Sequence, residues 1–282
     1  MKARAMSWAV LLGAALCVGA AQLAGAAPAP GTSCSGATMG TANDDNLIGT
    51  AQADRIASLG GADTVAGAQG NDCLSGGNGN DELAGGPGND QVNGDAGNDD
   101  VGGGSGNDAA HGGDGNDELS GGTGADRLFG DGGHDTIGGG AGNDRLSGGD
   151  GSDEMSGGPG VDVVVGGDGN DFVDGGSESD RINGNAGSDE LAGGGLDDSI
   201  VGGTQNDFLS GGLGDDELSG GPGADVLDGG PGLNRYHGGP GNDTILAANG
   251  RIESVSCGTG RDTAYVDPGD RAANCERIRR VR

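Results

Sequence analysis

A period of nine residues governs most of this chain. From Asp45 onward, every ninth position up to 243 holds Asp, and Asn234 is the one exception among the 23 positions. Two residues after each position stands an aliphatic residue in all but two repeats, and five residues before each stands Gly, except at Ser58. Gly also stands two residues before the Asp in 18 of the 23 repeats. The unit G-G-x-G-x-D-x-U-x, with U aliphatic, therefore runs without a slip over residues 40–246.

Such a short and regular period predicts a solenoid, because one unit of this size cannot bury its apolar face alone and must stack on its neighbours. In the segment x-U-x, strand alternation points U inward and its two neighbours outward. The segment GGxGxD predicts a turn, since glycine adopts positive φ without steric cost. Stacked turns would bring one carboxylate per repeat and several backbone carbonyl oxygens into columns.

The chain carries a large excess of negative charge, which a stack of this kind would have to balance with cations. The chain has 44 acidic and 14 basic residues, and its net charge is −30. This excess of negative charge argues against nucleic acid as a partner, because phosphates would be repelled. A chain with 70 Gly, 2% aromatic residues and this charge is expected to remain extended and disordered on its own. Cations bound along the Asp columns would remove the repulsion.

The repeat resembles the hemolysin-type calcium-binding repeat (RTX) family, on the strength of 23 copies of G-G-x-G-x-D-x-U-x in one register. The resemblance implies an all-β fold, a right-handed parallel β-roll of about 23 nonapeptide repeats with N- and C-terminal caps. It also implies that two repeats form one coil and that multiple Ca²⁺ ions lie along the turns.

Calcium takes six to eight oxygen ligands, among them carboxylates and backbone carbonyls. The candidate ligands are therefore the repeated aspartates and the turn glycines. The predicted metal-binding residues are Asp63, Asp72, Asp81, Asp90, Asp99, Asp108, Asp117, Asp126, Asp135, Asp144, Asp153, Asp162, Asp171, Asp189, Asp216, Asp225 and Asp243, with Gly76, Gly79, Gly85, Gly88, Gly112, Gly115, Gly148 and Gly151.

Some repeats depart from the pattern. Glu178, Leu196 and Gln205 stand where the second turn Gly belongs, which predicts weaker sites in the repeats of Asp180, Asp198 and Asp207. The first two repeats carry Asn43 and Gln52 at the same place and are expected to form a starting cap. Asn234 lacks the carboxylate altogether. Asp95 and Asp131 replace a turn Gly, and Asp tolerates positive φ better than most residues.

Residues 1–26 read as a secretory signal peptide. Lys2 and Arg4 precede an apolar run, and Ala24-Gly25-Ala26 has the small-x-small form of a cleavage site. A membrane anchor is the alternative, but the run falls short of the ~20 apolar residues that a spanning helix needs. We expect a secreted, extracellular protein without stable membrane insertion, in which residues 27–39 form an N-terminal cap segment.

Four cysteines remain after the signal peptide: Cys34, Cys73, Cys257 and Cys275. An even number in an exported chain suggests two disulfides, for which three pairings exist. Proximity in the sequence favours Cys34–Cys73 and Cys257–Cys275, one at each end of the repeats.

Residues 247–282 are expected to form a disulfide-closed C-terminal cap with a basic tail. The register fails after Leu246, although GTGRD at residues 258–262 echoes it one residue out of phase. Seven of the fourteen basic residues lie between Arg251 and Arg282. A solvated end is the plain interpretation of this tail, and contact with a polyanion or a cell surface is the alternative.

Catalysis is not expected. An active site is a single place, whereas the aspartates are 22 equivalent copies, and His111, His134 and His237 occupy outward positions of the repeat. The predicted function is a secreted calcium-binding repeat protein that folds into a β-roll on binding multiple Ca²⁺ ions. The alternative is an extracellular adhesin or a module that recognises a surface or glycan with its flat faces; ice binding is disfavoured because the outward positions lack ranks of Thr.

Overall fold

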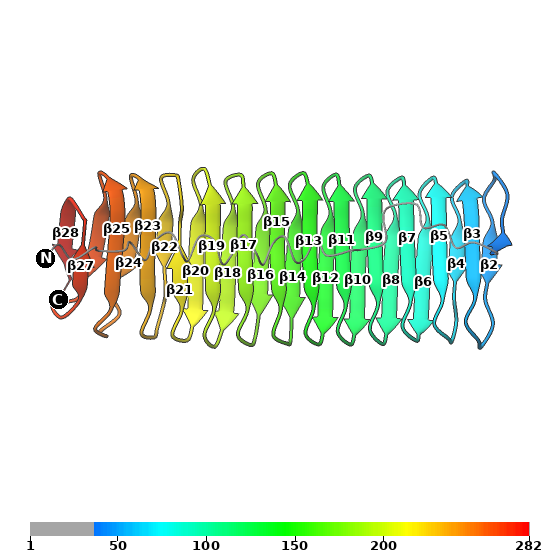
Figure 1. Ribbon diagram of the computed structural model, residues 1–282, viewed down its shortest axis with the longest axis horizontal. Helices are drawn as coiled ribbons and strands as arrows, with labels where there is room; N and C mark the ends of the chain where they lie inside the picture. The colour runs from blue at the N-terminus through cyan, green and yellow to red at the C-terminus, as the bar shows by residue number, and fades with distance from the viewer. Residues whose placement is uncertain (1–36, 282) are drawn as a thin grey trace, which may run out of the picture. The chain divides into compact units, whose positions relative to one another are not determined.

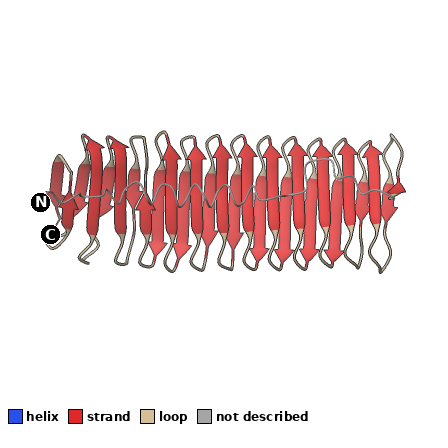
Figure 2. Ribbon diagram, in the orientation of Figure 1, coloured by secondary structure: helices blue, strands red, loops and turns tan. Residues whose placement is uncertain are grey.

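The computed structural model describes residues 37–281, and between these bounds the chain forms 28 short strands and no helix (Figure 2). The strands make two parallel sheets of fourteen, and consecutive strands alternate between them. Here they are called the odd sheet and the even sheet, after the strand numbers. Within these residues no helix is long and apolar enough to cross a membrane. The predicted signal peptide lies outside the described residues.

The odd sheet contains β1 (Thr38–Met39), β3 (Arg55–Gly60), β5 (Cys73–Asn78), β7 (Gln91–Ala96), β9 (Ala109–Asp114), β11 (Arg127–Gly132), β13 (Arg145–Asp150), β15 (Val163–Asp168), β17 (Arg181–Ala186), β19 (Ser199–Thr204), β21 (Glu217–Ser219), β23 (Arg235–Gly241), β25 (Ser254–Gly260) and β27 (Arg271–Ala273).

The even sheet contains β2 (Asn46–Ile48), β4 (Thr64–Ala66), β6 (Glu82–Pro87), β8 (Asp100–Ser105), β10 (Glu118–Thr123), β12 (Thr136–Ala141), β14 (Glu154–Gly158), β16 (Phe172–Gly176), β18 (Glu190–Gly195), β20 (Phe208–Leu213), β22 (Val226–Asp228), β24 (Thr244–Ala247), β26 (Thr263–Val266) and β28 (Arg277–Arg280).

Each strand of the repeats pairs with the strand two nonapeptides further along the chain. Leu128 in β11, for example, lies beside Ala110 in β9 and Leu146 in β13. One coil therefore consists of two repeats, as the family resemblance implies. The coils stack in chain order along one direction (Figure 1). The predicted all-β parallel roll is confirmed.

The interior between the sheets is a double column of the repeat's aliphatic residues. In β11 the pattern is exposed Arg127, buried Leu128, half-buried Phe129 and buried Gly130, which is strand alternation with U pointing inward. The core runs in this way from Ile56 to Val266. Ala110 and Tyr236, the two positions that break the aliphatic pattern, are buried in it as well.

The C-terminal segment continues the two sheets. The 23 counted repeats correspond to β2 through β24, and the segment after Leu246 adds β25 to β28. Tyr236 lies beside Val255, and Val255 beside Ala272, so core positions stay aligned although their spacing is no longer two whole nonapeptides. Because the loops here differ slightly in length, a search for an exact nine-residue period does not detect this continuation.

One disulfide lies at this end of the stack, where Cys257 is bonded to Cys275, as predicted. Toward the N-terminal end, Cys73 in β5 is also disulfide-bonded. The predicted partner of Cys73, Cys34, lies outside the described residues.

Candidate metal centre

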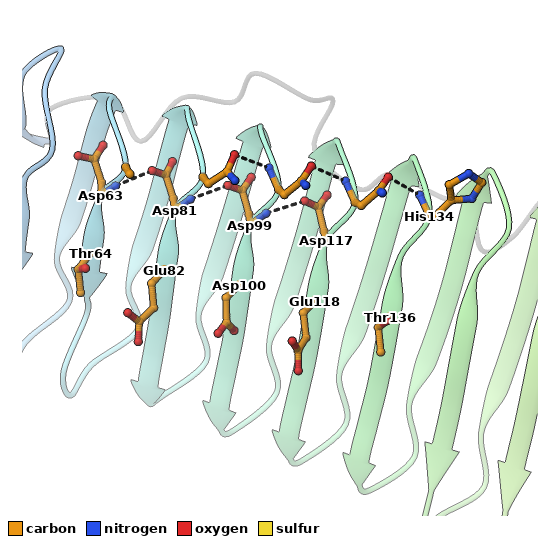
Figure 3. A pocket seen from close by; sticks show the side chains of 14 residues that line it. Asp63, Thr64, Asp81, Glu82, Asp99, Asp100, Asp117, Glu118, His134 and Thr136 are labelled. Carbon is orange, nitrogen blue, oxygen red and sulfur yellow. Dashed lines mark hydrogen bonds between the residues drawn. The ribbon is translucent and has the colours of Figure 1, made fainter.

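The repeated aspartates form two hydrogen-bonded ladders, one at each turn edge of the stack. The backbone N–H of Asp81 donates to Oδ1 of Asp99 at 2.8 Å, and the N–H of Asp99 donates to Oδ1 of Asp117 at 2.8 Å (Figure 3). The same bond recurs from coil to coil, starting from Asp45 on one edge and Asp54 on the other. One carboxylate oxygen of each Asp is thereby fixed, and the orientation of the other follows.

From the third repeat onward, the second oxygen of each Asp carboxylate, Oδ2, is buried and has no hydrogen-bond donor among residues 37–281. It lies against the Gly five residues earlier. At Gly103, the point where a Cβ atom would stand is 2.7 Å from Oδ2 of Asp108 and 2.8 Å from the carbonyl oxygen of Gly121, one coil further on. The carboxylate oxygen thus lies close to a carbonyl oxygen and receives no hydrogen bond from the described residues. Such an arrangement is costly for the chain unless a cation or a proton binds there.

Twenty aspartates and two residues after the repeats share this buried, unpartnered oxygen. They include the seventeen predicted ligands, and further Asp180, Asp198, Asp207, Asp262 and Glu253. The departures at Glu178, Leu196 and Gln205 leave the Asp arrangement in place; Leu196 and Gln205 adopt the positive φ of the missing Gly, 66° and 82°.

Burial raises the pKa of the repeated carboxyl groups from Asp81 to Asp225, and of Asp243 and Glu253. Desolvation is the largest cause, and the neighbouring aspartates of the ladder add repulsion. The pKa of Asp99 and of Asp171 rises to about 7, and that of Asp135 to about 6. The backbone N–H donors act in the opposite direction and do not cancel the effect. Burial therefore disfavours the ionised form of these carboxyl groups, and a neighbouring cation would favour it.

The predicted glycines divide into two groups. Gly76, Gly85, Gly112 and Gly148 stand five residues before an Asp, where a Cβ would enter the oxygen-lined space. Gly79, Gly88, Gly115 and Gly151 stand two residues before an Asp at φ between 128° and 154°. A side chain on this second group would collide with the backbone of the coil before it. The first group allows the carboxylate to approach the backbone closely, and the second shapes the turn.

In three turns, donors from the chain itself form hydrogen bonds to the carboxylate or carbonyl oxygens. In the first two repeats, the backbone N–H groups of Thr41 and Thr50 donate to Oδ2 of Asp45 (2.6 Å) and Asp54 (2.5 Å). In the third, residues 229–234, the side-chain nitrogen of Asn249 donates to the carbonyls of Gly230 (2.8 Å) and Gly232 (3.2 Å). In this turn the side-chain amide of Asn249 therefore supplies the donor to the carbonyl oxygens.

Ser58, the one residue that replaces the first turn Gly, is a partial version of the same arrangement. Its hydroxyl is buried and donates to the carbonyl of Gly76 at 2.7 Å. Oδ2 of Asp63 still has no donor among the described residues. The predicted site at Asp63 therefore has one of its carbonyl oxygens already occupied by a proton donor.

Sequence reasoning missed an outer ladder at the residue before many of the repeated aspartates. The N–H of Asn98 donates to Oδ1 of Asn80, and the N–H of Asn116 to Oδ1 of Asn98, both at 3.0 Å (Figure 3). The frequent N-D pair in the repeats was the available signal. A groove of about 590 Å³ runs beside this edge, and the exposed row Glu82, Asp100 and Glu118 borders it.

The donor set fits a hard cation. Each space offers one carboxylate oxygen with backbone carbonyl oxygens, and within residues 37–281 no three His, Cys, Asp or Glu side chains cluster closely enough to hold a metal by themselves. Oxygen-only sets of this kind suit Ca²⁺, whereas Zn²⁺ and Cu²⁺ prefer imidazole and thiolate.

A family of known calcium-binding repeats matches this chain. The RTX calcium-binding nonapeptide repeat model matches nine segments, some of them overlapping, between residues 39 and 251. The chain belongs to this family of calcium-binding repeats. No curated protein matches the sequence. The structure is similar to that of a hyperactive, Ca²⁺-dependent, β-helical antifreeze protein from an Antarctic bacterium, with 23% identity, a TM-score of 0.49 and coverage of 84% of this chain and 83% of the other.

Proposed function

We propose that this protein is an exported β-roll whose folding depends on the binding of multiple Ca²⁺ ions along its turns. The observation that carries the proposal is the repeated carboxylate oxygen, buried beside a carbonyl oxygen, that receives no hydrogen bond from residues 37–281. Bound calcium would supply positive charge at these points. Its binding free energy would become part of the folding free energy, as in other metal-dependent folds.

The chain's own residues prepare the sites. The ladder bond to Oδ1 aims Oδ2 of each Asp, and the Gly five residues earlier leaves the space open. Carbonyl oxygens of turn glycines from the adjacent coil complete the lining. We expect Asp72 to Asp225 to contribute ligands in this way, as well as Asp243, Asp262 and Glu253, which share the unpartnered oxygen.

Export supports the same function. The Cys257–Cys275 disulfide is typical of an oxidising compartment outside the cytosol. Low calcium inside the cell would keep the chain unfolded during export, and the roughly millimolar calcium outside suits extracellular modules of modest affinity. Function by binding rather than by catalysis follows from the repetition, since the same arrangement recurs in every coil.

The number of bound ions tests the proposal. Equilibrium dialysis of the full mature chain with calcium should give many ions per molecule, and a magnesium control should give few, because Mg²⁺ demands a stricter octahedral shell. Binding of one ion or none, or equal binding of magnesium, would contradict the proposal.

A further inference from the structure

Positive charge in the repeats is confined to one face of the molecule. All five arginines of residues 40–246 stand at the first residue of an odd-sheet strand: Arg55, Arg127, Arg145, Arg181 and Arg235. At the equivalent place in the even sheet stand Glu82, Asp100, Glu118, Glu154 and Glu190. Because the two sheets face opposite ways, the outward surfaces differ in charge.

The odd sheet also carries an acidic row, at the far ends of its strands. Asp114, Asp150 and Asp168 are the last residues of β9, β13 and β15, and Asp131 is the second-last residue of β11. All four are exposed. A strand of six residues is roughly 17 Å long, so the arginine row and the aspartate row are too far apart to pair within one copy.

Both rows stack like charges against each other. Arg127 lies directly beside Arg145, and Asp150 directly beside Asp168. Like charges on neighbouring strands are destabilising. The ion pairs within residues 37–281 are His111–Asp131 and Arg235–Glu217, so the arginines of β11, β13 and β17 have no acidic partner there. Their arrangement costs stability in the single molecule.

The third residues of the odd strands form a strip between the rows, and in the repeats this strip has no carboxylate and two imidazoles, His111 and His237. Phe129 stacks on His111 with ring centroids 4.5 Å apart, and both are half-buried. Ser147 and Val165 continue this strip on β13 and β15. The odd face therefore consists of a basic row, a middle strip of polar and apolar side chains without carboxylates, and an acidic row, all parallel to the stacking direction.

We propose that the odd face is a homodimer interface, with a two-fold axis parallel to the stacking direction. A half-turn about that axis keeps each coil at its level and exchanges the two ends of its strands. Arg145 of one copy then lies opposite Asp150 of the other, and the reciprocal pair forms by symmetry. Phe129 meets Phe129 of the second copy at the centre. The contact is self-complementary, as a closed two-fold dimer requires.

The even face is not self-complementary. The same rotation would place its acidic row against Pro87, Ser105, Thr123 and Ala141, which carry no charge. Packing an odd face on an even face of a second copy would satisfy the arginines but would leave the aspartate row unpaired. The dimer through two odd faces satisfies both rows.

A charge swap in the full mature chain tests the interface. Sedimentation equilibrium in low salt and saturating calcium should show a dimer for the native chain, and about tenfold weaker association for either R145E or D150R, since each reverses two symmetry-related pairs. The double variant R145E/D150R should restore dimerisation. Circular dichroism of each variant verifies that it is folded, so a failure of calcium-driven folding is distinguished from a failure of association.

A matched change on the other face is the control. E118R alters an exposed even-sheet residue and should leave the association unchanged. A monomeric native chain at 100 μM, or a double variant that stays dissociated, would overturn the proposal. Weakened association of E118R would indicate odd-on-even packing instead, and would also overturn it.

Cross-linking gives a second readout that does not depend on charge. The two-fold axis places position 129 beside itself, so F129C should form a covalent dimer under mild oxidation. S156C, at the equivalent row of the even sheet, should not. Equal cross-linking of the two variants would contradict a dimer through the odd face.

Discussion

At the scale of single residues, the two oxygens of one carboxylate have different roles. Oδ1 of Asp117 is held by the N–H of Asp99, and Oδ2 is buried without a donor among the described residues. The first interaction is structural and would survive replacement by an amide, as Asn234 demonstrates by accepting from the N–H of Asp216 at 2.9 Å. The second depends on negative charge. Substitution can therefore separate folding geometry from cation binding.

We predict that Asp117→Asn keeps the ladder and loses a calcium site. Isothermal titration calorimetry should show at least one ion fewer per chain. Stability in chelator should rise, because a buried charge disappears. Asp100→Asn removes the same charge from an exposed neighbour and should change neither quantity. Equal calcium binding by the two variants would refute the assignment of Oδ2.

Two adjacent glycines give a second matched pair. A Cβ at Gly103 would meet Oδ2 of Asp108 and the carbonyl of Gly121, whereas a Cβ at Gly102 would have its nearest contact at 3.8 Å. Gly103→Ala should lower the free energy of unfolding in calcium by about 1–3 kcal/mol. Gly102→Ala should stay within about 0.5 kcal/mol. Chemical denaturation of both variants measures the difference; similar values would mean that the space beside Asp108 is unimportant.

At the scale of elements, the turn of residues 229–234 differs from its neighbours. Asn249 donates to two of its carbonyls and to Glu253, and the hydroxyl of Tyr236 donates to the carbonyl of Leu246 at 3.3 Å. These donors belong to the chain. The coil built on this turn is thus stabilised without an ion, next to the disulfide that closes the same end.

Asn249→Ala should therefore destabilise the protein whether or not calcium is present. Loss of the donor to these part-buried carbonyls is expected to cost about 1–3 kcal/mol. Hydrogen exchange of the amides in β23 and β25 should accelerate by a similar factor in calcium and in chelator supplemented with a stabilising osmolyte. An effect seen in only one of the two conditions would show that this turn binds calcium after all.

The strands of the repeats were predictable because the nine-residue period, the strand alternation and the turn glycines all indicate the same fold. Leu128 points inward by strand alternation, and its partner in the next coil follows from two repeats per coil. The sequence could not reveal the coils after Leu246 in the same way, because altered loop lengths there shift Glu253 and Asp262 out of the nonapeptide phase while their carboxylates still join the ladders. The role of Asn249 was also hidden, since it depends on a contact with a turn in the preceding coil.

At the scale of the whole molecule, the columns of raised pKa values make the metal-free fold sensitive to pH. The folded state holds protons on Asp99, Asp171 and Asp198 up to pH about 7, whereas an ordinary Asp has a pKa of 3.8. Between these values the folded state binds more protons than the unfolded chain. Its stability therefore falls as the pH rises.

We accordingly expect that the chain in chelator has more β structure at pH 5 than at pH 8. Circular dichroism across this range measures the change, and protons would act as a partial substitute for calcium. A variant set lacking several column carboxylates, such as Asp99→Asn with Asp171→Asn, should flatten the profile. A β signal in chelator that increases toward pH 8 would contradict the sign of the effect.

Far-UV circular dichroism of residues 27–282 shows whether the chain folds only when calcium is bound. The titration runs at pH 7.5 from chelator to about 10 mM calcium, with a magnesium control. We expect a cooperative change from coil to β structure that calcium produces and magnesium does not. A spectrum already rich in β structure in chelator at this pH would contradict this expectation, because the roll would then be stable with its columns of carboxylates unneutralised.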